Sequence, residues 1–158
     1  MVQPDYRIVP DDLTGGSVTA LLRFHLDEMH RWSPPGSVNA MPVERLRQPD
    51  VSFYGAWDGG NLAAVGAIRQ LDARRGELKS MRADPAWRGR GAGQAILLHL
   101  LAEARGRGFA WLGLETGRTE PFHPAVALYR KHGFTPCAPF DGYVADDFSQ
   151  CMELALPT

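Results

Sequence analysis

The first third of the chain shows a strand-type and then a helix-type pattern of apolar positions. Residues 6–9 alternate polar and apolar side chains before Pro10, which predicts a short first strand. Between Val18 and Met29 the apolar residues recur at helical spacing, which predicts an amphipathic helix. Residues 33–37 contain two prolines and a glycine and are expected to form a loop. One or two helical turns are expected at residues 42–46.

An antiparallel group of strands is predicted next. Residues 51–57 and 62–70 are rich in β-forming side chains and flank Asp58-Gly59-Gly60-Asn61, a strong hairpin signal. Residues 77–83 follow as a third strand of this meander and stop at Asp84-Pro85.

The second half predicts a parallel crossover. Residues 93–105 carry apolar side chains along one side and are followed by glycines, as is typical of a helix and its end. Residues 110–116 form a buried type of strand, and a strand–helix–strand step of this length implies parallel pairing. Residues 125–132 predict a short helix closed by Gly133, and terminal strands are expected at 135–136 and 149–156.

Taken together, this order predicts an α/β fold. The expected architecture is a mixed central sheet with antiparallel N-terminal strands and one parallel crossover, flanked by helices, in a single domain spanning residues 1–158.

Hydrophobic residues make up 44% of the chain and charged residues 22%, which excludes a disordered, collagen-like or coiled-coil protein. No apolar run approaches the roughly 18 residues of a membrane span, and the first seven residues lack a secretion signal. We therefore expect a cytoplasmic protein with no membrane association.

The charge distribution favours a small anionic ligand. The net charge of −1 argues against a nucleic-acid partner held by bulk charge. Residues 69–93, however, hold seven basic and three acidic side chains. Residues 134–158 hold four acidic side chains and no lysine or arginine, which either favours a cationic amine substrate or reflects a solvated surface.

Metal and disulfide chemistry are not indicated. Cys137 and Cys151 lack the paired spacing of a zinc site or a disulfide framework. The five histidines include no His-Glu-x-x-His motif. We expect two reduced thiols and no metal.

A glycine-rich turn before the strongest helix is the main candidate for ligand binding. Arg88-Gly89-Arg90-Gly91-Ala92-Gly93 has the wrong glycine spacing for a dinucleotide-binding fingerprint and lacks the Gly-Lys-Ser/Thr ending of a P-loop. Free amides at a helix N-terminus, with arginines beside them, suit the oxygens of a pyrophosphate. A purely structural loop with solvated arginines is the alternative.

Here the sequence resembles the GNAT superfamily of N-acetyltransferases. The resemblance rests on the strand 78–83 with the Arg-x-x-Gly-x-Gly/Ala motif that follows it, and on residues 125–134, which end in Gly-Phe. It implies acetyl-CoA, or another acyl-CoA, as the co-substrate. The implied cofactor-binding residues are Met81 and Ala83 through their backbone, the turn Arg88, Gly89, Arg90, Gly91, Ala92, Gly93 and Gln94, and Ala125 and Tyr129. Phe122 stands where many members carry an asparagine that contacts the pantetheine arm.

The resemblance also suggests the groups that move protons. Tyr129, four residues before Gly133, is the candidate acid for the departing thiolate. Glu77 is the candidate base and Glu115 the alternative, and a water relay without a side-chain base is a third arrangement. Strand alternation places Glu77, Lys79 and Met81 on one face, unless a bulge changes the parity.

The acyl acceptor is expected to be a primary amine of a small molecule or peptide that attacks directly. The family's acceptor walls correspond here to the first helix, the loop after it and the C-terminal region, and the candidate contacts are His25, Ser33, Glu115 and Tyr143. A non-catalytic acyl-CoA-binding sensor is the alternative function. A homodimer formed through an exposed sheet edge is a further expectation.

Overall fold

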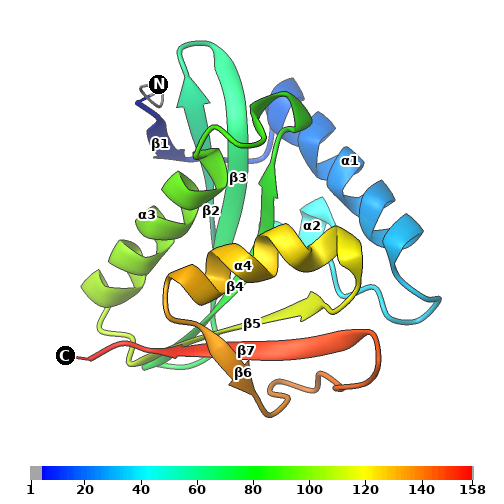
Figure 1. Cartoon of the computed structure of the whole chain (residues 1–158). Helices are drawn as coiled ribbons and strands as arrows, with labels where there is room; N and C mark the ends of the chain where they lie inside the picture. Colours follow the sequence, from blue (N-terminus) through cyan, green and yellow to red (C-terminus); the bar gives the residue numbers. More distant parts are fainter. Residues whose placement is uncertain (1–4, 158) are drawn as a thin grey trace.

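The chain forms one seven-stranded sheet with helices on both faces (Figure 1). The computed structural model describes residues 5–157, so the first four residues, which were part of the stretch searched for a secretion signal, lie outside it. The helical elements are α1 (Gly16–Trp32), α2 (Val43–Leu46), η1 (Pro85–Trp87), α3 (Ala92–Gly106), η2 (Glu120–Phe122) and α4 (His123–Lys131). The strands are β1 (Arg7–Pro10), β2 (Val51–Asp58), β3 (Asn61–Gln70), β4 (Arg75–Ala83), β5 (Trp111–Gly117), β6 (Thr135–Cys137) and β7 (Ser149–Ala155).

The sheet order is β1-β2-β3-β4-β5-β7-β6, and β4–β5 is its parallel pair. The remaining neighbours are antiparallel. The predicted mixed sheet with one parallel crossover through α3 is therefore confirmed. The hairpin is confirmed as well, because Asp58 pairs with Asn61 across a two-residue turn in which Gly59 adopts a φ of +58°.

Two hydrophobic cores lie on opposite faces of the sheet. The larger lies under α3 and α4 and includes Leu78, Ile96, Leu100, Tyr129 and Phe134. The smaller lies under α1 and α2. Its buried members are Leu13, Val18, Leu21, Leu22, Leu46, Phe53, Leu62, Val65 and Ala67.

A β-bulge in β4 decides which side chains reach each face. Lys79 pairs with Ala67 and Arg82 with Val65, so two residues of β4, Ser80 and Met81, lie opposite the single residue Gly66. Ser80 adopts a φ of +56° there. Across the bulge, a Cβ on Gly66 would lie 2.7 Å from the Met81 sulfur and 2.5 Å from a methyl group of Ile96, so only glycine fits.

The alternation expected along β4 is wrong, because the bulge interrupts it. Met81 packs against the core under α3, whereas Lys79 and Arg82 contact the segments on the opposite face. Met81 is therefore not on the face of Glu77 and Lys79. The extra residue at Ser80–Met81 has reversed the parity of the strand.

The parallel strands β4 and β5 separate after a short contact. Their register runs only from Arg75↔Trp111 to Glu77↔Gly113, and beyond that point the strands diverge, as Figure 1 shows. The C-terminal halves of β4 and β5 thus leave an opening in the sheet. We call this opening the fork.

No helix within residues 5–157 combines the length and apolar character needed to cross a bilayer. The two cysteines are free thiols that face each other in the β6–β7 pair.

Candidate functional site

A cavity of about 150 Å³ lies at the fork. Residues from both faces of the sheet line it, because α1 and α4 both contribute to its wall. The lining residues are His25, Met29, Trp32, Ser33, Ser37, Val38, Asn39, Ala40, Leu78, Lys79, Ser80, Met81, Arg82, Leu114, Glu115, Thr116, Gly117, Pro121, Phe122, Ala125, Tyr129 and Phe148.

The glycine-rich turn joins β4 to α3 through the short helix η1. Gly89 and Gly91 adopt φ values of +73° and +80°, which side chains with a Cβ rarely take. Gly91 is the N-cap of α3 and supplies no side-chain cap, so the amides of the first helical turn are left for another acceptor. The turn thus has the backbone geometry of an anion cradle.

Contacts to two other elements hold this turn in place. The Tyr6 hydroxyl donates to the Arg90 carbonyl at 2.7 Å, and the Arg90 guanidinium lies 5.1 Å from the centroid of the Trp87 ring. At the start of α3, the Gln94 side chain accepts from Lys131 Nζ at 2.7 Å. The cradle is therefore positioned between Tyr6, the residue before β1, and Lys131 of α4.

Tyr129 approaches the cavity from the α4 side. Its ring is buried and packs edge-to-face on Phe134, with centroids 5.7 Å apart. Burial raises the pKa of the Tyr129 phenol above its ordinary value, so its hydroxyl keeps its proton at neutral pH. A neutral phenol can donate that proton to a developing anion.

Glu115 lies on β5 on the other face and, among residues 5–157, is the one carboxylate in the cavity wall. Burial raises the pKa of Glu115, and the hydrogen bond it accepts from the Ser149 hydroxyl partly opposes that rise. A carboxylate with a raised pKa is a better proton acceptor near neutral pH.

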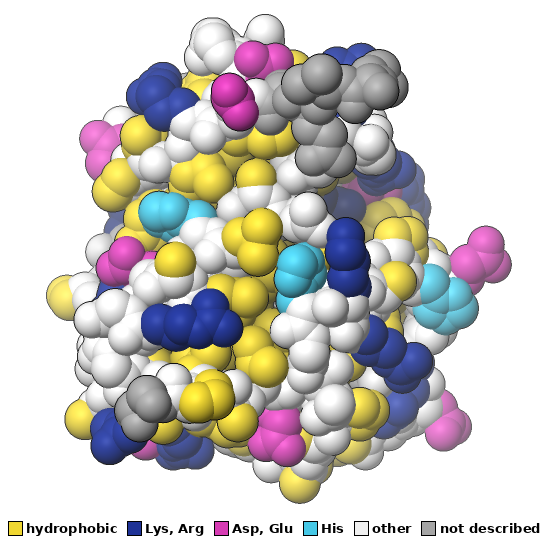
Figure 2. Space-filling view, turned by 60° about the vertical axis from the view of Figure 1, so that its left-hand side comes forward, with side chains coloured by type: hydrophobic (Ala, Val, Ile, Leu, Met, Phe, Trp, Pro, Cys, Tyr) yellow, Lys and Arg dark blue, Asp and Glu magenta, His cyan; other side chains and the backbone are white. Residues whose placement is uncertain are grey.

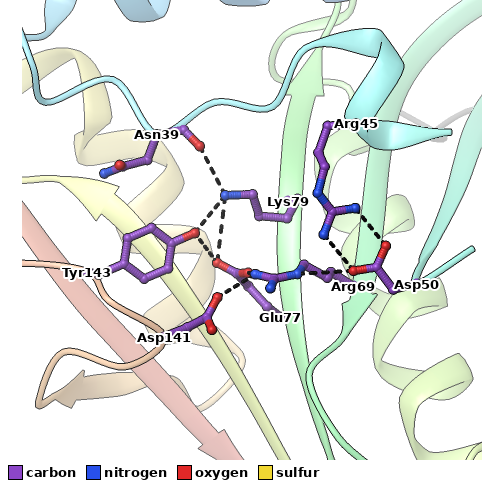
Figure 3. Close-up of polar contacts among 8 residues, drawn as sticks. All are labelled: Asn39, Arg45, Asp50, Arg69, Glu77, Lys79, Asp141 and Tyr143. Carbon is purple, nitrogen blue, oxygen red and sulfur yellow. Dashed lines mark hydrogen bonds and ion pairs between the residues drawn. The ribbon is translucent and has the colours of Figure 1, made fainter. Parts of the chain in front are cut away.

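Glu77 belongs to a buried ionic network instead (Figure 3). Its side chain has no exposed surface, and its carboxylate pairs with Arg69 at 3.1 Å and lies 3.7 Å from Lys79 Nζ. It also accepts a hydrogen bond from the Tyr143 hydroxyl. Neither Glu77 nor Tyr143 is among the residues that line the cavity.

The network extends to the segment between α1 and α2, which carries Asn39, and to the segment between β6 and β7, which carries Asp141 and Tyr143. Arg69 also pairs with Asp141 and lies 3.4 Å from Asp50, which in turn forms two 2.6 Å hydrogen bonds with Arg45. Lys79 Nζ donates to the Asn39 carbonyl at 3.1 Å and to Tyr143 at 2.7 Å. Figure 3 shows these groups converging on the strand end where β4 still pairs with β5.

Three buried polar atoms in the cavity wall have no hydrogen-bond partner within the described chain. They are His25 Nδ1, Ser80 Oγ and Arg82 Nε. Burial, together with Arg82 and Lys79, lowers the pKa of His25 to about 3, so its ring is neutral. Unpaired buried polar atoms are costly and mark a place where a ligand can supply partners.

The structure brings together some of the residues proposed from the sequence, whereas no residue of the turn 88–94 lines the cavity. Met81, Ala125 and Tyr129 meet His25, Ser33 and Glu115 around one cavity. Glu77 and Tyr143 lie in the ionic network, and Ala83 packs against the core under α3. The sequence analysis missed Ser80 and Arg82, since their orientation depends on the bulge rather than on strand alternation.

The surface charges do not form a nucleic-acid-binding band on the visible face. Figure 2 shows lysine and arginine side chains scattered among hydrophobic and uncharged ones. Within residues 5–157, no three His, Cys, Asp or Glu side chains lie together as metal ligands would.

The known proteins that this chain resembles are named as acetyltransferases or acyltransferases. The model of the acetyltransferase (GNAT) family matches residues 19–134. The N-acetyltransferase YsnE of Bacillus subtilis, itself uncharacterized, is 44% identical over 142 residues, which cover 90% of this chain and 94% of that protein.

Solved structures show the same fold. A crystal structure from Klebsiella pneumoniae, named as an acyl-CoA N-acyltransferase, superposes with a TM-score of 0.76 at 30% identity over 96% of this chain and 97% of its own. A Bacillus subtilis acetyltransferase solved in complex with CoA has a TM-score of 0.73 and covers 97% of this chain and 100% of its own. At 19% identity, this second likeness is evidence for the fold alone.

The burial of Glu77 predicts a large effect on stability. We expect Glu77→Gln to lower the free energy of unfolding by on the order of 3 kcal/mol, because it leaves the buried ammonium of Lys79 without its counter-charge. Urea unfolding measures the loss. The matched control is Asp141→Asn, which removes a partly exposed partner of the same Arg69 and should cost less than about 1 kcal/mol. Equal losses for the two variants would contradict the role given to Glu77.

Proposed function

This chain belongs to the acetyltransferase (GNAT) family and is an acyl-CoA-dependent acetyltransferase, and we propose that it transfers the acetyl group of acetyl-CoA to a primary amine by direct attack at the fork. The observation that carries the proposal is the cavity at the fork between β4 and β5. It has Tyr129 in its wall on the α4 side and Glu115 on the opposite face.

The residues around the fork fit acetyl-CoA. The turn 88–94 offers two left-handed glycines, uncapped helical amides and two arginines, which suit a pyrophosphate. Met81 and Ala125 line the cavity on the side of α4, where the pantetheine arm would lie. Phe122 also lines the cavity, where its ring packs against Trp32 of α1.

The bulge in β4 would serve the carbonyl of the acetyl group. Because Ser80 and Met81 both lie opposite Gly66, regular ladder pairing is interrupted at this point. Backbone N–H groups released from a ladder can donate to an oxygen that gains negative charge. Met81 and Ala83 are the positions that we propose for these backbone contacts.

Bound acetyl-CoA supplies the thioester, an electrophile toward a neutral amine. Free alkylammonium groups have a pKa of about 10, so the amine must lose a proton before it attacks. Glu115 is the proposed acceptor of that proton, since its carboxylate lies in the cavity wall whereas that of Glu77 lies in the ionic network. Tyr129 is the proposed donor to the departing sulfur.

The cradle is tested by the double variant Arg88→Ala/Gly91→Val. We expect its Kd for acetyl-CoA, measured by titration calorimetry, to rise at least about tenfold. The variant loses a charge-assisted hydrogen bond and forces a β-branched residue into a φ of +80°. The matched control, Arg105→Ala/Gly108→Val, makes the same changes at the other end of α3, where Gly108 also has a φ of +80°, and should leave Kd unchanged. An unchanged Kd in the folded cradle variant would refute the assignment.

The base assignment predicts a change in the pH profile. In the wild type, kcat/KM should rise with pH as Glu115 loses its proton, with a midpoint above the ordinary glutamate pKa because burial raises it. Glu115→Gln should abolish this rise and lower the maximal kcat/KM by about 10²-fold. Glu153→Gln, which alters a β7 carboxylate bonded to Trp111, is the control and should keep the wild-type profile. A wild-type profile for Glu115→Gln would leave a water relay or Glu77 as the base.

The acid assignment predicts a loss of turnover without a loss of cofactor affinity. Tyr129→Phe keeps the packing of the ring but removes the hydroxyl, so kcat should fall by about 10²-fold while the Kd for acetyl-CoA stays within about twofold. Tyr54→Phe removes a hydroxyl from another buried tyrosine of the same core, outside the cavity wall, and should leave kcat unchanged. Normal turnover in Tyr129→Phe would restrict this residue to packing.

A further inference from the structure

Arg82 is the least expected charged group in the cavity wall. It is placed on the α1 face by the bulge, and its side chain is only 10% exposed. Its guanidinium lies 5.2 Å from the centroid of the Phe24 ring and 5.1 Å from that of Trp32. Two aromatic rings thus hold the guanidinium in one orientation, which is how arginine is preorganised for recognition of planar anions.

One buried donor of Arg82 has no hydrogen-bond partner in the described chain. Its Nη2 donates to Glu28 at 2.8 Å, whereas its buried Nε has no partner in the described chain. An unpaired guanidinium N–H in a nine-tenths buried side chain is costly unless an acceptor oxygen binds there.

Three arginines share one buried carboxylate beside the cavity wall. Glu28 is a single buried carboxylate, and it is contacted by Arg31, Arg82 and Arg88. Lys79 contributes another cation to the cavity wall, although it is close to Glu77. Burial is the main cause of the depressed pKa of His25, and the positive charges of Arg82 and Lys79 lower it further.

Ser80 and His25 add two more unpaired polar atoms to the same wall. The Ser80 hydroxyl can donate to an oxygen, and so can the neutral His25 ring in the tautomer that has its proton on Nδ1. Three potential donors on residues that line the same cavity suit a carboxylate, which accepts several hydrogen bonds through two oxygens.

The rest of this side of the cavity is apolar and aromatic. Trp32, Phe122 and Phe148 form a continuous edge-to-face series, with centroids 5.7 Å and 5.5 Å apart. Met29 lines the same region. An acceptor can thus place an apolar side chain on this wall while its polar groups reach Glu115 and Arg82.

We propose that the acceptor is an amine that also carries a carboxylate, as an apolar amino acid does, and that Arg82 Nε binds this carboxylate with Ser80 Oγ and His25 Nδ1. The proposal rests on the acetyl transfer to an amine proposed above. The acidic C-terminal residues need then not select a cationic amine, and a solvated surface is the other explanation given for them above. Of those residues, Asp141 is paired with Arg69, Asp146 accepts from the backbone of Ser149, and Glu153 accepts from Trp111.

Pairs of acceptors that differ only in the carboxylate test this proposal. L-Phenylalanine is compared with 2-phenylethylamine, and L-methionine with 3-(methylthio)propylamine, on the full chain saturated with CoA for binding or acetyl-CoA for turnover. Calorimetry measures Kd, and mass spectrometry measures the N-acetylated product. For at least one pair, we expect the carboxylate-bearing member to bind at least tenfold more tightly and to be acetylated with a correspondingly higher kcat/KM.

Variants of the arginines locate the subsite. Arg82→Gln should remove the tenfold preference, and so should Arg82→Lys, which keeps a positive charge beside Glu28 but lacks the Nε donor. Arg31→Gln is the control, because Arg31 also pairs with Glu28 but lies outside the cavity wall, and it should keep the preference.

The outcomes separate the two proposals. Acetylation of amines with no preference for the carboxylate in either pair, or a preference that survives Arg82→Lys, would overturn the carboxylate subsite and leave the proposed function intact. Tighter, Arg82-dependent binding of the carboxylates without any acetylated product would support the subsite and count against amine acetylation. If no carboxylate-bearing acceptor is bound and none is acetylated, the subsite is overturned.

Discussion

One extra residue in β4 determines how the two faces of the sheet meet at the fork. The bulge at Ser80–Met81 requires a glycine on the neighbouring strand, because the space beside Gly66 is filled by Met81 and Ile96. It directs Met81 into the core under α3 and Arg82 toward α1. Without the bulge, Met81 and Arg82 would exchange faces. The cavity would then lose the Met81 side chain from its wall on the α4 side and the Arg82 guanidinium from its wall on the α1 side.

On the N-terminal side of the bulge, Glu77 forms ionic contacts with Arg69 and Lys79. These contacts lie where the pairing of β4 with β5 ends. Buried ion pairs contribute little net stability but are expensive to break on one side. Their geometric effect here is to attach the segments that carry Asn39, Asp141 and Tyr143 to the closed end of the fork. This division explains how two glutamates on neighbouring strands can differ in role, with Glu77 in the network and Glu115 in the cavity wall.

The local features of the fold could be predicted from the sequence because they depend on near neighbours. The hairpin follows from Asp58-Gly59-Gly60-Asn61, and helix α3 from its apolar spacing and the glycines around it. The left-handed backbone at Gly89 and Gly91 was likewise implied by the residue type. The parallel crossover followed from the length of the strand–helix–strand step, and the family from two motifs and their spacing.

The orientation of the β4 side chains required the tertiary structure, because a bulge leaves no local signal in Leu-Lys-Ser-Met-Arg. Alternation alone predicted Met81 beside Glu77, and only the pairing with β3 shows the reversed parity. The burial of Glu77, the engagement of Tyr143 and the stacking of Arg82 also depend on segments 40 or more residues away in the chain, such as Phe24 and Asn39. The sequence by itself thus determined the elements and the glycine-rich turn, whereas the packing of distant segments decided which polar groups face the cavity.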